Sequence, residues 1–96
     1  QIIVFGNGNM GKLVRKFLQR KDIGITAYMD NNEQLWGQSD AGIPIVAPQD
    51  GVRQYADAVY LVANVNYYKD IVKQLVSLGI SGERIITCFD YESLLF

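Results

Sequence analysis

The stretch IIVFGNGNMG at residues 2–11 decides the fold. Residues 2–5 form a short apolar run that is mostly β-branched, which is typical of a strand buried on both faces of a parallel sheet. The glycines that follow have the G-x-G-x-x-G spacing, directly after this strand and at the start of a helix. Gly6 permits the tight turn, Gly8 lets backbone N–H groups approach a phosphate, and Gly11 lets the helix pack against the strand. The sequence therefore predicts a phosphate-binding turn.

Strand-like and helix-like segments alternate along the rest of the chain. A first helix runs to about Arg20, and further strands and helices are expected at 24–29, 43–46, 49–55, 58–63, 67–78 and 84–88. This alternation implies parallel strands joined by right-handed crossovers. The predicted fold class is α/β, a Rossmann-like three-layer domain with a parallel five-stranded sheet. With the strands numbered along the chain, the expected order is 3-2-1-4-5.

The two longer helices each carry one apolar stripe at helical spacing. In the first helix the stripe is Met10, Leu13, Val14, Phe17 and Leu18. In the second it is Tyr68, Ile71, Val72, Leu75 and Val76. The charged residues of the first helix, Arg15 among them, are assigned to the solvent-facing side, except that Lys12 either faces solvent or reaches a phosphate from the first helical turn.

In such sheets a ligand lies beyond the carboxyl ends of the strands, at the switch point between the first and fourth strands. Three segments meet there, at residues 6–11, 30–32 and 63–66. The candidate binding residues are Gly6, Asn7, Gly8, Asn9, Met10, Gly11, Asp30, Asn31, Ala63, Asn64 and Asn66. The helix N-terminus adds unpaired donors and a partial positive charge for a phosphate, with Asn9 as the predicted N-cap.

Asp30 follows the second strand at about the spacing of an acid that binds a ribose hydroxyl pair. Its charge disfavours a 2′-phosphate, so NAD or a ribonucleotide fits better than NADP. The alternative is that Asp30 caps a turn formed with Asn31 and Asn32.

The residues after the fourth strand also allow two interpretations. Either Asn64 and Asn66 contact a base, a sugar or a pyrophosphate, or Asn66 caps the following helix and Asn64 is an ordinary loop residue. Tyr67 either stacks on a base or packs against its neighbours.

Composition excludes several classes of function. The 96 residues are 49% hydrophobic and 20% charged, which suits a globular domain, and the net charge of −1 gives no footprint for nucleic acid or an anionic membrane. No apolar run approaches the length of a membrane span, so no membrane contact is expected. Cys88 is the only cysteine, which excludes an internal disulfide and fits a cytoplasmic location with an inert core thiol.

The sequence lacks the parts that catalysis would need. There is no histidine, and no lysine has a tyrosine four residues before it, as short-chain dehydrogenases require. The chain begins at Gln1 and is in a strand by Ile2, so we expect residues 1–96 to be one nucleotide-binding domain of a longer protein. The expected partners are a nucleotide-type small molecule, other domains of that protein and, as a further candidate, a second copy of the chain.

Several motifs carry a resemblance over nearly the whole chain: IVFGNGNMGK at 3–12, AYMDNN at 27–32, LWG at 35–37 and GIPI at 42–45. The chain resembles the Rossmann-like nucleotide-binding domains of bacterial polysaccharide-biosynthesis proteins. Those domains accompany nucleotide-sugar dehydratases and epimerases, sugar-phosphate transferases, acetyltransferases, glycosyltransferases and some methyltransferases.

The resemblance implies a phosphate loop at Gly6, Gly8 and Gly11 and a ribose-binding acid at Asp30, with catalytic residues in other domains. Its implied cofactor is NAD or a nucleotide-sugar. Three functions follow: a non-catalytic nucleotide-binding module of a transferase or sugar-modifying enzyme, the cofactor half of an NAD-dependent oxidoreductase or epimerase, or a structural or dimerisation domain without a ligand.

Overall fold

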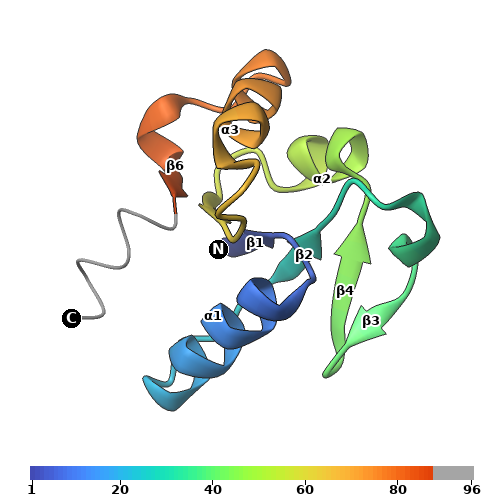
Figure 1. Cartoon of the computed structure of the whole chain (residues 1–96), viewed down its shortest axis with the longest axis vertical. Helices are drawn as coiled ribbons and strands as arrows, with labels where there is room; N and C mark the ends of the chain where they lie inside the picture. Colours follow the sequence, from blue (N-terminus) through green and yellow to red (C-terminus); the bar gives the residue numbers. More distant parts are fainter. Residues whose placement is uncertain (88–96) are drawn as a thin grey trace.

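A six-stranded sheet forms the middle layer of the computed structural model, which describes residues 1–87 (Figure 1). The strands are β1 (Ile2–Phe5), β2 (Ala27–Met29), β3 (Ser39–Asp40), β4 (Ile43–Val46), β5 (Val59–Val62) and β6 (Ile85–Thr87). The helices are α1 (Asn9–Arg20), α2 (Pro48–Gln54) and α3 (Tyr68–Ser77), with 3₁₀ turns η1 (Glu33–Leu35) and η2 (Gly82–Arg84). The expectation for Cys88 lies outside the described residues.

The strand order is β3-β4-β2-β1-β5-β6. All pairings are parallel except that of β3 with β4. The five predicted strands therefore occur in the predicted order and confirm the α/β, Rossmann-like class. The addition is β3, which pairs with β4 at the sheet edge and which the sequence did not predict. The second predicted strand is also shorter, because only its last three residues pair with β1.

Two apolar clusters cover the two faces of the sheet. On one face α2 and α3 pack through Val52, Ile71 and Leu75, and on the other α1 packs through Val14 (Figure 1). Ile3 in the central strand β1 is fully buried, as expected for a strand covered on both sides.

The predicted apolar stripes of the two longer helices are confirmed in part. Leu13 is 61% exposed and Val76 is 52% exposed, so neither belongs to the core that the periodicity predicted. Arg15 is buried, although it was assigned to solvent, and its Nε donates a 2.7 Å hydrogen bond to the Tyr28 hydroxyl. The buried side of α1 is thus rotated toward Arg15, because the Tyr28 hydroxyl inside the fold needs a hydrogen-bonding partner.

Candidate functional site

The register of the sheet brings the three predicted segments to one edge. Phe5, the last residue of β1, lies opposite Met29 of β2 and Val62 of β5. The residues that follow these three strand ends therefore emerge side by side. Gly6 N–H donates to the Met29 carbonyl at 2.7 Å, and Ala63 N–H donates to the Phe5 carbonyl at 2.9 Å.

The three glycines of the turn have different roles. Gly6 has φ +115°, and a Cβ there would lie 3.0 Å from the Ala63 carbonyl oxygen. A Cβ on Gly11 would lie 1.8 Å from the Gly6 carbonyl oxygen, so α1 can approach β1 only with glycine at that position. A Cβ on Gly8 would meet nothing within 4 Å. Gly6 and Gly11 are thus required by the fold, whereas Gly8 borders open space.

The N-terminus of α1 has no side-chain cap. Gly8, not the predicted Asn9, is the N-cap residue, because the first helical hydrogen bond already runs from Lys12 N–H to the Gly8 carbonyl at 3.1 Å. Asn9 is consequently the first helical residue and is exposed. No acidic residue lies in the first turn. The N–H groups and the positive end of the helix dipole are therefore available to an anion.

Asp30 joins the turn to the end of β2. Its Oδ2 accepts a 2.9 Å hydrogen bond from the Asn7 N–H, and its Oδ1 accepts a 2.8 Å bond from the Asn32 N–H. The second bond is the local turn that the sequence offered as the alternative, so Asp30 does stabilise a turn. A carboxylate has about four acceptor positions. Each oxygen consequently keeps capacity for a ligand hydroxyl.

Asn7 and Trp36 hold this arrangement from the β3 side. The Asn7 Nδ2 donates to Asp40 Oδ2 at 3.1 Å, and the Trp36 Nε1 donates to the Asp30 carbonyl at 2.7 Å. Asp40 was not predicted to take part. Because β3 was missed, nothing in the sequence placed Asp40 beside the glycine turn.

The start of α3 differs from the prediction. The helix begins at Tyr68, and Asn64 Oδ1 accepts a 2.7 Å hydrogen bond from the Tyr67 N–H. Asn64 rather than Asn66 therefore stabilises the turn into the helix, because its oxygen reaches the N–H three residues ahead. Asn66 is exposed.

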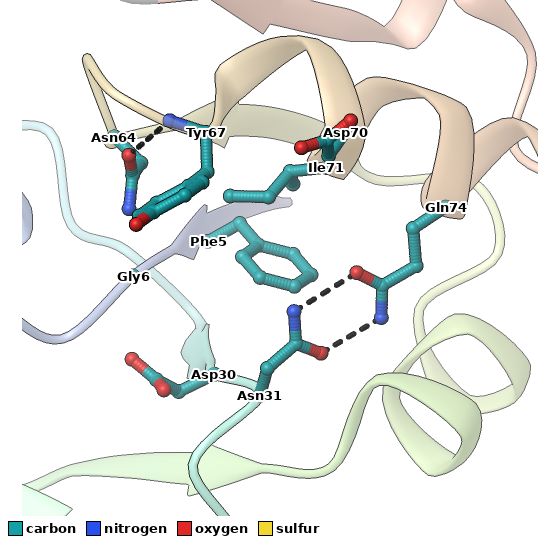
Figure 2. A pocket seen from close by; sticks show the side chains of 9 residues that line it. All are labelled: Phe5, Gly6, Asp30, Asn31, Asn64, Tyr67, Asp70, Ile71 and Gln74. Carbon is teal, nitrogen blue, oxygen red and sulfur yellow. Dashed lines mark hydrogen bonds between the residues drawn. The ribbon is translucent and has the colours of Figure 1, made fainter.

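Two adjoining compartments lie along this edge. The first, here the loop compartment, has a volume of about 360 Å³. Its lining residues are Gly6, Gly8, Asn9, Met10, Asp30, Ala63, Asn64, Val65 and Asn66. The second, the tyrosine compartment, has a volume of about 320 Å³ and is shown in Figure 2. Its lining residues are Phe5, Gly6, Asp30, Asn31, Asn64, Tyr67, Asp70, Ile71 and Gln74.

Gly6, Asp30 and Asn64 line both compartments, so the two form one cleft with Asp30 at the junction. All predicted candidates line this cleft except Asn7 and Gly11, which shape the turn behind it. Each volume falls in the range of about 300–1,000 Å³ that small-molecule sites occupy.

Asp70 and Gln74 are lining residues that the sequence analysis missed. The available signal was their i, i+4 spacing on a helix that starts at the switch point, which places both on one helix face.

Within residues 1–87 there is no cluster of three or more His, Cys, Asp or Glu side chains that could hold a metal ion. In the same part of the chain no helix combines the length and apolar character needed to cross a membrane.

The sheet order, the glycine turn and the cleft at the switch point define a Rossmann-like domain with a ligand-sized site. Residues 1–86 match the family model described as C2185-like, N-terminal, and the chain belongs to that family. A search of the curated proteins found no significant match.

Solved structures confirm the fold. UDP-D-quinovosamine 4-dehydrogenase from Vibrio fischeri superposes with a TM-score of 0.69 at 19% identity, over 98% of this chain and 81% of that chain. RSP, a Rex-family repressor, gives a TM-score of 0.67 at 14% identity, over 90% of this chain and 50% of its own.

RSP in complex with β-NADH gives a TM-score of 0.65 at 14% identity, over 98% of this chain and 55% of that chain. RSP has also been solved with β-NAD⁺ and operator DNA. This chain spans about half the length of RSP, so the DNA complex is a property of that protein, and the absence of nucleic-acid binding here stays a prediction.

Proposed function

We propose that this chain is a nucleotide-binding module for NAD or a nucleoside-diphosphate sugar, without catalytic activity of its own. It would serve a larger bacterial glycan- or polysaccharide-biosynthesis protein, a transferase or a sugar-modifying enzyme. The observation that carries the proposal is the Asp30 carboxylate, which is fixed to the glycine turn by the Asn7 N–H at the junction of the two compartments.

The lining residues of the two compartments favour one orientation of a nucleoside diphosphate. Its ribose hydroxyls would donate to the remaining acceptor positions of Asp30. Its diphosphate would lie in the loop compartment, above Gly8 and against the uncapped N-terminus of α1. Its base would enter the tyrosine compartment, where Tyr67 is 62% exposed and offers a ring for stacking.

The same residues oppose a ribose 2′-phosphate. Asp30 would repel it, and none of the residues that line either compartment is a lysine or an arginine. NAD should therefore bind more tightly than NADP. The ligands named for the structural neighbours, β-NADH for RSP and a UDP-sugar for the dehydrogenase, are of the two ligand classes proposed here.

The proposal is tested by thermal shift with NAD, NADP, UDP-sugars, coenzyme A and S-adenosylmethionine. A ligand at 100 times its Kd stabilises the fold by about 2.7 kcal/mol, which corresponds to a rise in Tm of about 10–20 °C in a domain of this size. We expect NAD or a UDP-sugar to give this rise and NADP to give less.

Gly8→Ala is the decisive variant for the phosphate position. A methyl group there meets no protein atom within 4 Å, so the fold should be retained, but the methyl group would occupy the space over which a phosphate approaches. The expected result is an unchanged Tm without ligand and a lost ligand shift. If no ligand of the panel raises the Tm of the wild-type chain, the result would instead support a structural domain without a ligand.

A further inference from the structure

An amide pair crosses the tyrosine compartment between the end of β2 and α3. Asn31 Nδ2 donates to Gln74 Oε1 at 2.9 Å, and Gln74 Nε2 donates to Asn31 Oδ1 at 2.8 Å, as Figure 2 shows. The two residues are 43 positions apart in the sequence, and both bonds are exposed. Because solvent-exposed amides can exchange such bonds for others at little cost, the pair can open to a ligand.

Asp70 lies one helical turn before Gln74 and lines the same compartment. Phe5 and Ile71 are buried beneath the compartment, whereas the Tyr67 ring, which lines the same compartment, is 62% exposed (Figure 2). The compartment thus combines a surface for a flat ring with two kinds of polar group. Gln74 offers an NH2 group that donates and a carbonyl oxygen that accepts, and Asp70 offers acceptors only.

We propose, on the basis of the proposed function, that this compartment selects an adenine nucleotide over a uracil nucleotide through Asp70 and Gln74. Adenine presents an amino donor beside a ring-nitrogen acceptor, the pattern that an asparagine or glutamine amide binds in two hydrogen bonds. The amino group has a second hydrogen, which the Asp70 carboxylate can accept.

The Asp70 carboxylate is the group that distinguishes adenine from uracil and hypoxanthine. Uracil also has an N–H beside a carbonyl, so the Gln74 amide alone would accept either base. Uracil and hypoxanthine, however, have a carbonyl oxygen where adenine has its amino group. That oxygen would face the Asp70 carboxylate, and two acceptors without a shared hydrogen repel each other. A site built to bond an amino group rejects the analogue that lacks it.

The test compares ADP, IDP and UDP, which share the ribose and the diphosphate and differ only in the base. Titration calorimetry of the wild-type chain should give a Kd for ADP at least about fivefold lower than for IDP or UDP, the lower end of what one bidentate amide–base contact contributes. Gln74→Ala should weaken ADP binding by a similar factor.

Asp70→Asn is the central variant, because an asparagine can donate to a carbonyl oxygen. We expect it to strengthen IDP and UDP binding and to bring the three Kd values within about twofold. Asp22→Asn is the matched control, since Asp22 is exposed, lies outside both compartments and has φ 59°, a conformation that asparagine adopts readily. It should leave all three Kd values unchanged.

The outcomes separate the two proposals. Equal binding of the three diphosphates, or tighter binding of UDP than of ADP, would overturn selection of adenine and leave the nucleotide-binding module in place. An ADP preference that persists in Asp70→Asn would overturn the role of Asp70. No binding of any diphosphate to the wild-type chain would overturn both proposals.

Discussion

At the scale of single residues, the structure makes the largest changes to the interpretation of polar side chains. Helical spacing placed Arg15 in solvent, but it is buried against the Tyr28 hydroxyl. The sequence pattern of one helix cannot reveal this, because the partner hydroxyl lies on a strand 13 residues away. Asp30 follows the second strand, as its spacing to the glycine turn indicated, and its bond to the Asn7 N–H adds the structural reason for its position. Its role in binding a ribose stays a prediction.

Two buried tyrosines should make the fold less stable at alkaline pH. Burial raises the pKa of the Tyr60 hydroxyl above 10.0, and burial together with the Asp40 carboxylate raises that of Tyr28, partly offset by Arg15. A raised pKa in the folded state means that the neutral form stabilises the fold. This contribution is fully present below about pH 10 and is lost as the pH rises through the folded-state pKa.

Tyr60→Phe tests this dependence. The variant loses the 2.7 Å bond to the Tyr55 carbonyl, so at pH 7 its free energy of unfolding should fall by about 0.5–1.5 kcal/mol. Above pH 10 the difference from the wild type should shrink, because the variant has one buried hydroxyl fewer to ionise. Urea denaturation from pH 7 to 11 measures both effects, with the exposed Tyr67→Phe as control. Parallel pH curves for the wild type and Tyr60→Phe would contradict the explanation.

At the scale of elements, the sequence predicted strands and long helices better than their ends. The β3–β4 hairpin was missed because its turn has an unusual sequence. Both turn residues, Ala41 and Gly42, have positive φ. A two-residue turn of this kind is normally announced by Asn-Gly or Asp-Gly, and alanine rarely adopts that conformation. Both asparagine caps were also misplaced: Gly8 rather than Asn9 is the N-cap of α1, and Asn64 rather than Asn66 accepts the hydrogen bond at the turn into α3.

The junction of β1 and α1 gives the sharpest prediction at this scale. In Gly11→Ala the new methyl group would collide with the backbone at Gly6, so α1 must move away from β1. Overpacking of this kind costs about 1–3 kcal/mol, or about 4–8 °C in Tm for each kcal/mol. Thermal unfolding should show this loss in Gly11→Ala and no loss in Gly8→Ala. A similar loss in both variants would mean that the turn tolerates neither methyl group.

At the scale of the whole molecule, the order of the five parallel strands was predictable because alternating strands and helices leave few topologies. That order also located the cleft, since it determines which strand ends are neighbours. The opposite wall was predictable only in part, because the i, i+4 spacing places Asp70 and Gln74 on one helix face but does not show that this face borders the cleft. Asp70 and Gln74 reach the cleft only because α3 packs over β1 and β5 through Ile71 and Leu75, and no local pattern encodes the distance between elements that are far apart in the chain.

The cleft joins segments that are about 60 residues apart, so a bound nucleotide should act on all of them together. We expect NADH or the tightest-binding diphosphate to slow amide hydrogen exchange at residues 6–12, 30–32 and 63–68. The hairpin at residues 39–46 and the end of α1 near Arg20, which line neither compartment, should exchange as before. Hydrogen–deuterium exchange followed by mass spectrometry measures this, with Gly8→Ala as the control that should show no protection. Protection at only one of the three segments would mean that the ligand occupies one compartment and does not span the cleft through Asp30.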